Sequence, residues 1–206
     1  MKTHHTLVLL CILGTVVAST AARADAPRYD FMDLGYQSIN DPASTGLTSD
    51  HAFGLDGSYA FTDRFIGIAA YAHESADFNM FGSGSASGNS YSVGVGYRFP
   101  LNSNVDLVPN LSYISTNASA NVGGFSSSTS DTGYDVGLQL RAMVTDQFEL
   151  DGSVDHSSPG SSTNSVSVGA LYNFTPVFAV GVGYGLATTN AQNTNGWTLA
   201  LRYYFK

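Results

Sequence analysis

Cysteine and charged residues are scarce in this chain of 206 residues. The single cysteine, Cys11, lies in an apolar N-terminal segment, so the remainder can form no disulfide, zinc–thiolate site or cysteine nucleophile. Asp, Glu, Lys and Arg together make up 12% of the residues, about half their usual share in soluble proteins. The formal net charge of −8 offers no positive footprint for nucleic acid. We predict no metal site and no cofactor.

The N-terminal segment has the features of an export signal. Lys2 precedes an apolar run over 7–18, and small residues lead to Ala22-Arg23-Ala24. A run of this length is too short to span a membrane as a helix, and an A-x-A sequence marks a cleavage site. We predict a cleaved signal peptide over 1–24 and one domain over 25–206.

The last segment alternates large apolar residues with small or polar ones. Its members are Gly196, Trp197, Leu199, Leu201, Tyr203 and Phe205, followed by Lys206. A period of two predicts a β-strand, because successive side chains of a strand point to opposite faces. About ten residues with aromatic ends is the length of a tilted strand that crosses a bilayer.

Similar segments recur along the chain. We predict ten strands, over 28–38, 51–61, 65–75, 90–99, 105–116, 133–144, 148–157, 164–174, 177–188 and 196–205. Short connections, three of them with a Thr-x-x-Phe pattern, alternate with long ones rich in Ser, Gly and Asn over 39–50, 76–89, 117–132, 158–163 and 189–195. The orientation of the third strand is left open, because 65–71 is apolar on both faces.

One face of nearly every predicted strand is apolar, and the other carries polar residues and glycine. A soluble barrel would turn the polar face to water, where abundant glycine and scarce lysine are unusual. A membrane barrel turns its apolar face to lipid and its polar face to the lumen. We therefore predict an all-β, ten-stranded antiparallel up-and-down transmembrane β-barrel, with short periplasmic turns and longer extracellular loops.

Short motifs over 33–36, 57–61, 94–98 and 201–205 resemble the small porin-like family with an outer-membrane β-barrel domain. Opacity-type adhesins are relatives, and ten-stranded members are the nearest. The resemblance implies location in the cell outer membrane, a surface role in adhesion or envelope integrity, and no catalytic residue. It also implies that the closing strand is recognised by the barrel assembly machinery. The expected partners are outer-membrane lipid and a surface partner of the extracellular loops, and the expected state is a monomer.

Charged residues are predicted to meet inside the barrel. The set comprises Arg98, Arg141, Arg202, Asp33, Asp56, Glu149 and Asp151. Buried carboxylates need partners, and the forked guanidinium of arginine can bridge several of them. We favour a network that plugs a narrow lumen over its alternative, a charged constriction that selects small solutes or ions.

Three histidines are expected at the extracellular rim, each beside an acid. The pairs are Asp50-His51, His73-Glu74 and Asp155-His156. They leave a rim hydrolase as the least favoured alternative, because rim histidines with solvated tips are the commoner outcome. We predict that the protein is not an enzyme.

Overall fold

The computed structural model describes residues 26–40, 47–79, 83–123 and 125–205 of the chain. The predicted signal peptide, 1–24, and Lys206 lie outside these residues. All regular structure within them is β-sheet. The described part holds no helix of the length and apolarity needed to cross a membrane.

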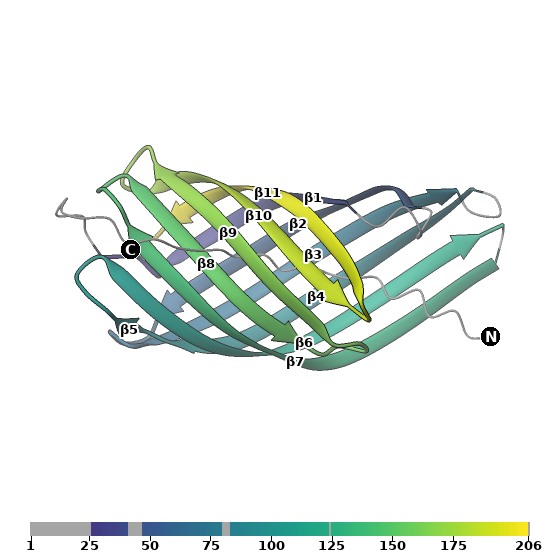
Figure 1. Ribbon diagram of the computed structural model, residues 1–206, viewed down its shortest axis with the longest axis horizontal. Coiled ribbons are helices and arrows are strands. Elements are labelled where there is room, and N and C mark those ends of the chain that lie inside the picture. The colour runs from purple at the N-terminus through teal and green to yellow at the C-terminus, as the bar shows by residue number, and fades with distance from the viewer. Residues whose placement is uncertain (1–25, 41–46, 80–82, 124, 206) are drawn as a thin grey trace.

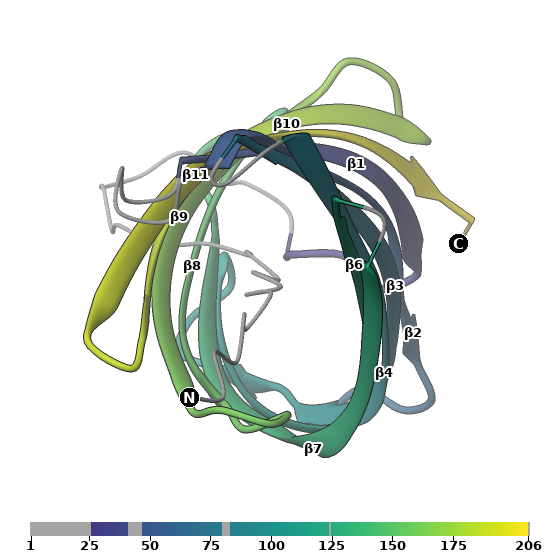
Figure 2. The ribbon, with the colours of Figure 1, turned by 90° about the vertical axis from the view of Figure 1, so that its right-hand side faces the viewer.

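The strands form one antiparallel sheet that closes on itself. They are β1 (Phe31–Asn40), β2 (Leu47–Ala60), β3 (Phe65–Asn79), β4 (Ser83–Tyr97), β5 (Phe99–Pro100), β6 (Val105–Val122), β7 (Phe125–Met143), β8 (Phe148–Ser157), β9 (Thr163–Asn173), β10 (Phe178–Thr189) and β11 (Gln192–Tyr204). Neighbours in sequence pair from β1 to β4 and from β5 to β11, β4 pairs with β6, and β1 pairs with β11 to complete the ring (Figures 1 and 2).

The short β5 continues β4 past Arg98. Gly96 of β4 lies opposite Asn110 of β6, and Phe99 of β5 lies opposite Leu107, so the register is the same on both sides of the interruption. β4 and β5 therefore act as one strand of the barrel. The closed ten-stranded antiparallel barrel predicted from the sequence is confirmed.

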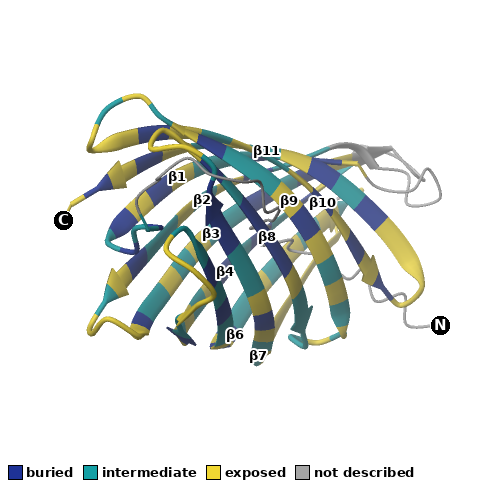
Figure 3. Ribbon diagram, turned by 60° about the vertical axis from the view of Figure 1, so that its left-hand side comes forward, coloured by how far each residue is buried: buried dark blue, intermediate teal, exposed yellow. Residues whose placement is uncertain are grey.

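The two faces of the sheet have opposite polarity. Buried and exposed residues alternate along the strands (Figure 3), and the exposed positions within the barrel wall are mostly apolar. Aromatic residues gather at the two ends of this outer surface. The band at the long-hairpin end comprises Tyr36, Phe53, Tyr71, Tyr91, Tyr113, Tyr134, Tyr184 and Trp197. Such girdles mark the two membrane–water interfaces of an outer-membrane barrel.

The third strand, whose orientation the sequence left open, turns its isoleucines inward. Ile66 is 2% exposed and packs in a lumen cluster with Tyr29 and Val108. Gly67 faces outward, and the ring of Phe61 lies over it, 2.6 Å from where a Cβ would be. Both faces of this segment read as apolar because the lumen holds an apolar cluster at this depth.

The three Thr-x-x-Phe turns share one hydrogen-bonding pattern. The Oγ1 atoms of Thr62, Thr145 and Thr175 accept from the backbone N–H of the phenylalanine three residues later, at 2.9, 3.0 and 2.9 Å. Each threonine side chain thus accepts from a backbone donor of the tight turn, and in the second turn the N–H of Phe148 also reaches the backbone oxygen of Thr145 at 3.3 Å.

Four predicted boundaries are wrong. The segments 76–89 and 117–132, expected as loops, are mostly strand, because β3, β4, β6 and β7 continue as paired hairpins beyond the aromatic band. The connection expected over 189–195 shrinks to Asn190 and Ala191, both with positive φ, as a tight hairpin requires. The first strand begins at Phe31 rather than residue 28, because 28–30 turn into the lumen.

Two lumen-facing glycines provide a test of this packing. A Cβ on Gly94 would meet Ser112 Cα at 2.7 Å, whereas a Cβ on Gly35 would find nothing closer than Leu199 O at 3.8 Å. We expect Gly94→Ala to lower the free energy of unfolding by about 1–3 kcal/mol. Gly35→Ala should stay near the wild-type value. Urea unfolding in lipid vesicles measures both, and equal stability of the two variants would contradict the close approach of β4 and β6.

Candidate functional site

The arginines of the lumen each hold a carboxylate. Arg202 binds Asp33 through two hydrogen bonds, from Nε at 2.8 Å and from Nη2 at 2.6 Å, and both residues are almost fully buried. They lie opposite each other on β11 and β1, the two strands that close the barrel. The ion pair therefore crosses the seam between the ends of the sheet.

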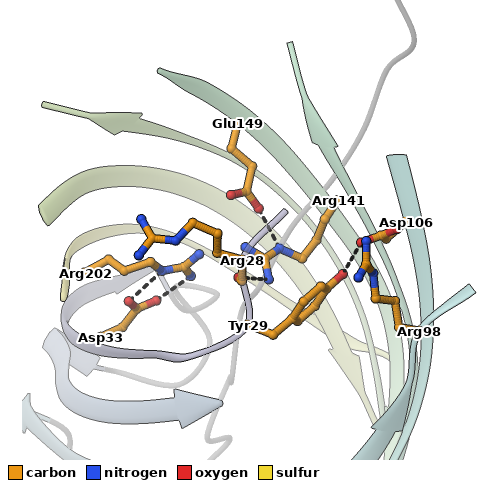
Figure 4. A network of polar contacts seen from close by, with 8 residues as sticks. All are labelled: Arg28, Tyr29, Asp33, Arg98, Asp106, Arg141, Glu149 and Arg202. Atoms are coloured by element: carbon orange, nitrogen blue, oxygen red, sulfur yellow. Dashed lines mark hydrogen bonds and ion pairs between the residues drawn. The ribbon is translucent and has the colours of Figure 1, made fainter. Parts of the chain in front are cut away.

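Arg141 lies at the centre of the network (Figure 4). Its Nε donates to Glu149 Oε1 at 2.5 Å, and its Nη1 donates to the backbone oxygen of Arg28 at 2.9 Å. The guanidinium carbon also lies 4.5 Å from the centre of the Tyr29 ring. Arg141 is 2% exposed and Glu149 0%, so this pair is closed off from solvent. A guanidinium over an aromatic face gains a cation–π interaction, which strengthens as water is excluded.

Arg98 binds a carboxylate that the predicted set omitted. Its Nε donates to Asp106 Oδ2 at 2.6 Å, and Asp106 is fully buried. Tyr29 donates to the same oxygen at 3.0 Å. The sequence contained the signal for Asp106, which follows the strand period of Val108 and Asn110 on the lumen face. The pairing itself was missed because Arg98 and Asp106 are brought together only by the turn over 101–104.

Residues before β1 complete the network from inside the barrel. Tyr29 reaches from this segment to Asp106 on β6, and the guanidinium of Arg28 lies 4.0 Å from the centre of the Tyr204 ring. Asp30 accepts a hydrogen bond from the backbone N–H of Ala60 at its side chain and from that of Phe205 at its backbone oxygen. The period-two pattern could not find this role, because these residues are not in a strand.

The other predicted lumen residues also face inward. Asp56 lies directly opposite Asp33 across β1 and β2, so two carboxylates stand beside Arg202. Asp151 lies opposite Arg141 across β7 and β8 and is 2% exposed. The structure thus brings all seven predicted residues to the interior. Its ion pairs, however, join Arg98 to Asp106, Arg141 to Glu149 and Arg202 to Asp33.

The closing strand presents the predicted residues to the outside. Trp197, Leu199, Leu201, Tyr203 and Phe205 are each 39% to 50% exposed on the lipid-facing surface. Gly196 is needed where β11 approaches β1, since a Cβ there would lie 2.6 Å from the backbone oxygen of Ser38. The intervening Tyr204 points inward and packs edge-on against Phe31, with ring centres 6.2 Å apart.

The rim histidines are separated from the acids beside them in the sequence. His51, His73 and His156 face outward, whereas Glu74, 1% exposed, faces the lumen. Neighbours along a strand point to opposite faces, so none of the three sequence pairs forms a His–acid dyad. Two of the histidines instead contact asparagine side chains on the neighbouring strand. His73 Nδ1 lies 3.0 Å from Asn89 Oδ1, and His156 Nδ1 lies 2.9 Å from Asn164 Oδ1.

Across the four described ranges, no three His, Cys, Asp or Glu side chains converge as metal ligands would.

Removal of one arginine tests what the lumen pairs contribute. Arg202→Ala would leave Asp33 buried beside Asp56 without its bidentate partner. We expect the free energy of unfolding to fall by about 3–5 kcal/mol. Arg64→Ala, at an exposed turn, is the control and should change stability by less than about 0.5 kcal/mol. Both values come from urea unfolding in vesicles, and similar small losses would show that Arg202 is dispensable.

Comparisons with known proteins agree with this architecture. Residues 7–163 match the model of the outer membrane protein beta-barrel domain family. Ail, the attachment invasion locus protein of Yersinia pestis, is 18% identical over 85% of this chain and 99% of that chain, with a TM-score of 0.45. The translocator domain of the autotransporter NalP from Neisseria meningitidis is 12% identical over 85% of this chain and 88% of that chain, with a TM-score of 0.53.

The beta domain of the Bordetella autotransporter BrkA is 10% identical over 85% of this chain and 98% of that chain, with a TM-score of 0.52. Among curated proteins, none matches the chain. The family match extends over well more than half of the chain and agrees with the closed barrel and its apolar outer surface. The chain therefore belongs to the outer membrane protein beta-barrel domain family and is located in the cell outer membrane.

Proposed function

We propose that this protein is a surface barrel with a plugged lumen, whose role is structural or interactive rather than transport. The single observation that supports this role most strongly is the buried network at the periplasmic end. Asp106, Arg141 and Glu149 are between 0% and 2% exposed. Tyr29, from the segment before β1, reaches across to Asp106 on β6, so a side chain that is not part of the wall lies within this end of the lumen.

The extended hairpins supply a surface for a partner outside the cell. Residues 125–130 of β7 pair with β6 on one side. On the other side β8 pairs only from Asp135 and the 158–160 connection lies against 131–134, so the described strands leave that edge of 125–130 open. An open edge presents backbone N–H and C=O groups to which another extended chain can pair. Residues 125–130 are all exposed. We propose this edge as the contact for a surface partner, with the barrel itself a monomer in outer-membrane lipid.

The alternative is a narrow channel for small solutes or ions. The polar lumen favours it, since inward side chains such as Gln37, Ser153 and Ser167 would suit a wetted interior. The two functions differ in what the arginines do, because a plug needs their ion pairs intact, whereas a channel uses their charge as a filter.

Ion conductance in a planar bilayer separates the plug from the channel. We expect no steady conductance from the wild-type protein. Arg141→Ala should produce conductance, because Glu149 loses its partner and water can enter the lumen. Steady wild-type currents that merely become more cation-selective in Arg141→Ala would instead support the channel.

We also propose that the closing strand carries the signal for barrel assembly. Phe205→Asp places a charge in the periplasmic aromatic band, where Phe205 is 44% exposed to lipid. We expect it to lower the folded fraction recovered in outer membranes severalfold, as judged by the gel shift between unheated and heated samples. Lys206→Asp is the control and should assemble normally. Equal assembly of the two variants would contradict this role of Phe205.

A further inference from the structure

A second cluster of polar residues lies on the outer surface, away from the lumen. His73 and Ser75 are two residues apart on β3 and so share its outward face. Ser75 Oγ lies 3.3 Å from His73 Nε2, and His73 Nδ1 lies 3.0 Å from Asn89 Oδ1 on β4. A hydroxyl, an imidazole and an amide are thus connected in series, each within hydrogen-bonding reach of the next.

The hydrogen bonds of Asn89 determine which nitrogen of His73 carries the proton. Asn89 Oδ1, the amide oxygen, accepts a hydrogen bond from the hydroxyl of Tyr71 at 2.8 Å. An amide oxygen only accepts, so Nδ1 of His73 must be the protonated nitrogen. The lone pair on Nε2 is then directed at Ser75 Oγ, where it can accept the hydroxyl proton.

From this geometry we propose that Ser75, His73 and Asn89 form the catalytic centre of an esterase that acts on the acyl esters of membrane lipids. Ser75 is the nucleophile and His73 is the general base. Asn89 is a positioning residue that holds the tautomer and ring orientation of His73. These are the relations that define a serine–histidine centre, whatever the fold that carries it. The proposal is independent of the plugged lumen, because the cluster faces away from it.

The side chains that flank Ser75 are suited to stabilise the negative charge of the reaction. His51 on β2 and Ser87 on β4 lie directly opposite Ser75 on either side. Directly opposed side chains of an antiparallel sheet have Cβ atoms about 4.5–5.5 Å apart. An imidazole N–H and a hydroxyl at this distance can both donate to an oxyanion that forms on the carbonyl attacked by Ser75.

The depth of the cluster indicates lipid as the substrate. Tyr71 and Tyr91 lie opposite each other in the extracellular aromatic band, and His73 and Asn89 are the next opposed pair above them on the outward face. On the outer face of these strands, Val93 and Val95 lie below the band, while Ser75, Ser87 and Asn89 lie above it. The surroundings therefore change from hydrocarbon to polar head groups at this height. Acyl ester carbonyls of lipids lie at that boundary, with water available from above.

The reaction balances without a further reactant besides water. Ser75 Oγ attacks the acyl carbonyl carbon as His73 Nε2 takes its proton. The tetrahedral intermediate then collapses, the ester C–O bond breaks, and His73 gives the proton to the departing alcohol. Water next attacks the acyl–Ser75 ester, with His73 again taking and returning a proton, which releases the fatty acid and restores the hydroxyl.

From the sequence, the candidate partners of the rim histidines were the acids beside them in the chain, and the protein was expected not to be an enzyme. The partners of His73 lie elsewhere. Ser75 is two residues away on the same face of β3, and Asn89 lies opposite on β4, a position that depends on the strand register. His156 shows the contrast, because its Nδ1 contacts Asn164 in the same way, but the serine two residues on, Ser158, lies beyond the end of β8. It provides a matched control within the same molecule.

The test uses the full mature chain refolded into detergent micelles that contain diacyl phosphatidylethanolamine. Fatty acid release is measured by mass spectrometry, and an alkyl fluorophosphonate probe reports on the reactive serine. We expect wild-type protein to release fatty acid and to carry the probe on Ser75. A monomeric ester, p-nitrophenyl acetate, should be cleaved at least about tenfold more slowly, because it is not held at the interface.

The variants separate catalysis from folding. Ser75→Ala and His73→Ala should lose hydrolysis and probe labelling while keeping the gel shift of a folded barrel. Asn89→Ala should lower the rate at least about tenfold by freeing the tautomer of His73, and Asn89→Asp should restore it. His156→Ala should keep the wild-type rate.

Three results would overturn the proposal. Absence of both fatty acid release and probe labelling in the folded wild-type protein would show that the cluster is not reactive. Hydrolysis that persists in folded Ser75→Ala would place the activity elsewhere. Cleavage of the monomeric ester alone would exclude lipid as the substrate class.

Discussion

The hydrocarbon interior of the membrane offers no hydrogen-bond partner to the backbone, and the whole structure follows from that constraint. A sheet can satisfy all its N–H and C=O groups there only by closing on itself, as these strands do when β1 pairs with β11. Closure turns alternate residues inward, where the polar ones need partners within a narrow space. The buried ion pairs of Asp106, Arg141 and Asp33 answer that need.

The same network joins the first and last strands of the barrel. Asp33 and Arg202 connect β1 to β11 across a separation of 169 residues in sequence, and Phe31 packs against Tyr204 beside them. The backbone of Asp30 accepts a hydrogen bond from Phe205, the residue that ends the aromatic pattern of the closing strand. The seam between β1 and β11, the buried network of the lumen and the periplasmic aromatic band therefore form one region, so a change in any of them is expected to affect assembly.

The sequence predicted the parts that depend on a strict period of two. Alternation placed Arg141 and Glu149 in the lumen and Trp197 and Phe205 on the outside, because a strand leaves side chains only two directions. Contacts between residues on different strands were harder to predict from the sequence, since they depend on strand register and turn geometry. The pairing of Arg98 with Asp106 and the contact of His73 with Asn89 were missed for this reason, whereas the role of Tyr29 was missed because it precedes the first strand. The Ser- and Asn-rich hairpins were mistaken for loops because their composition lacks the usual strand residues.

The central claim is that Arg141 and Glu149 stabilise the barrel as a pair, and a double-mutant cycle measures this directly. Urea unfolding of Arg141→Ala, Glu149→Ala and the double variant in lipid vesicles gives their coupling free energy. A desolvated pair joined at 2.5 Å should couple by at least about 1 kcal/mol, with the double variant more stable than the sum of the single losses predicts. Losses that add to within about 0.3 kcal/mol would contradict the account.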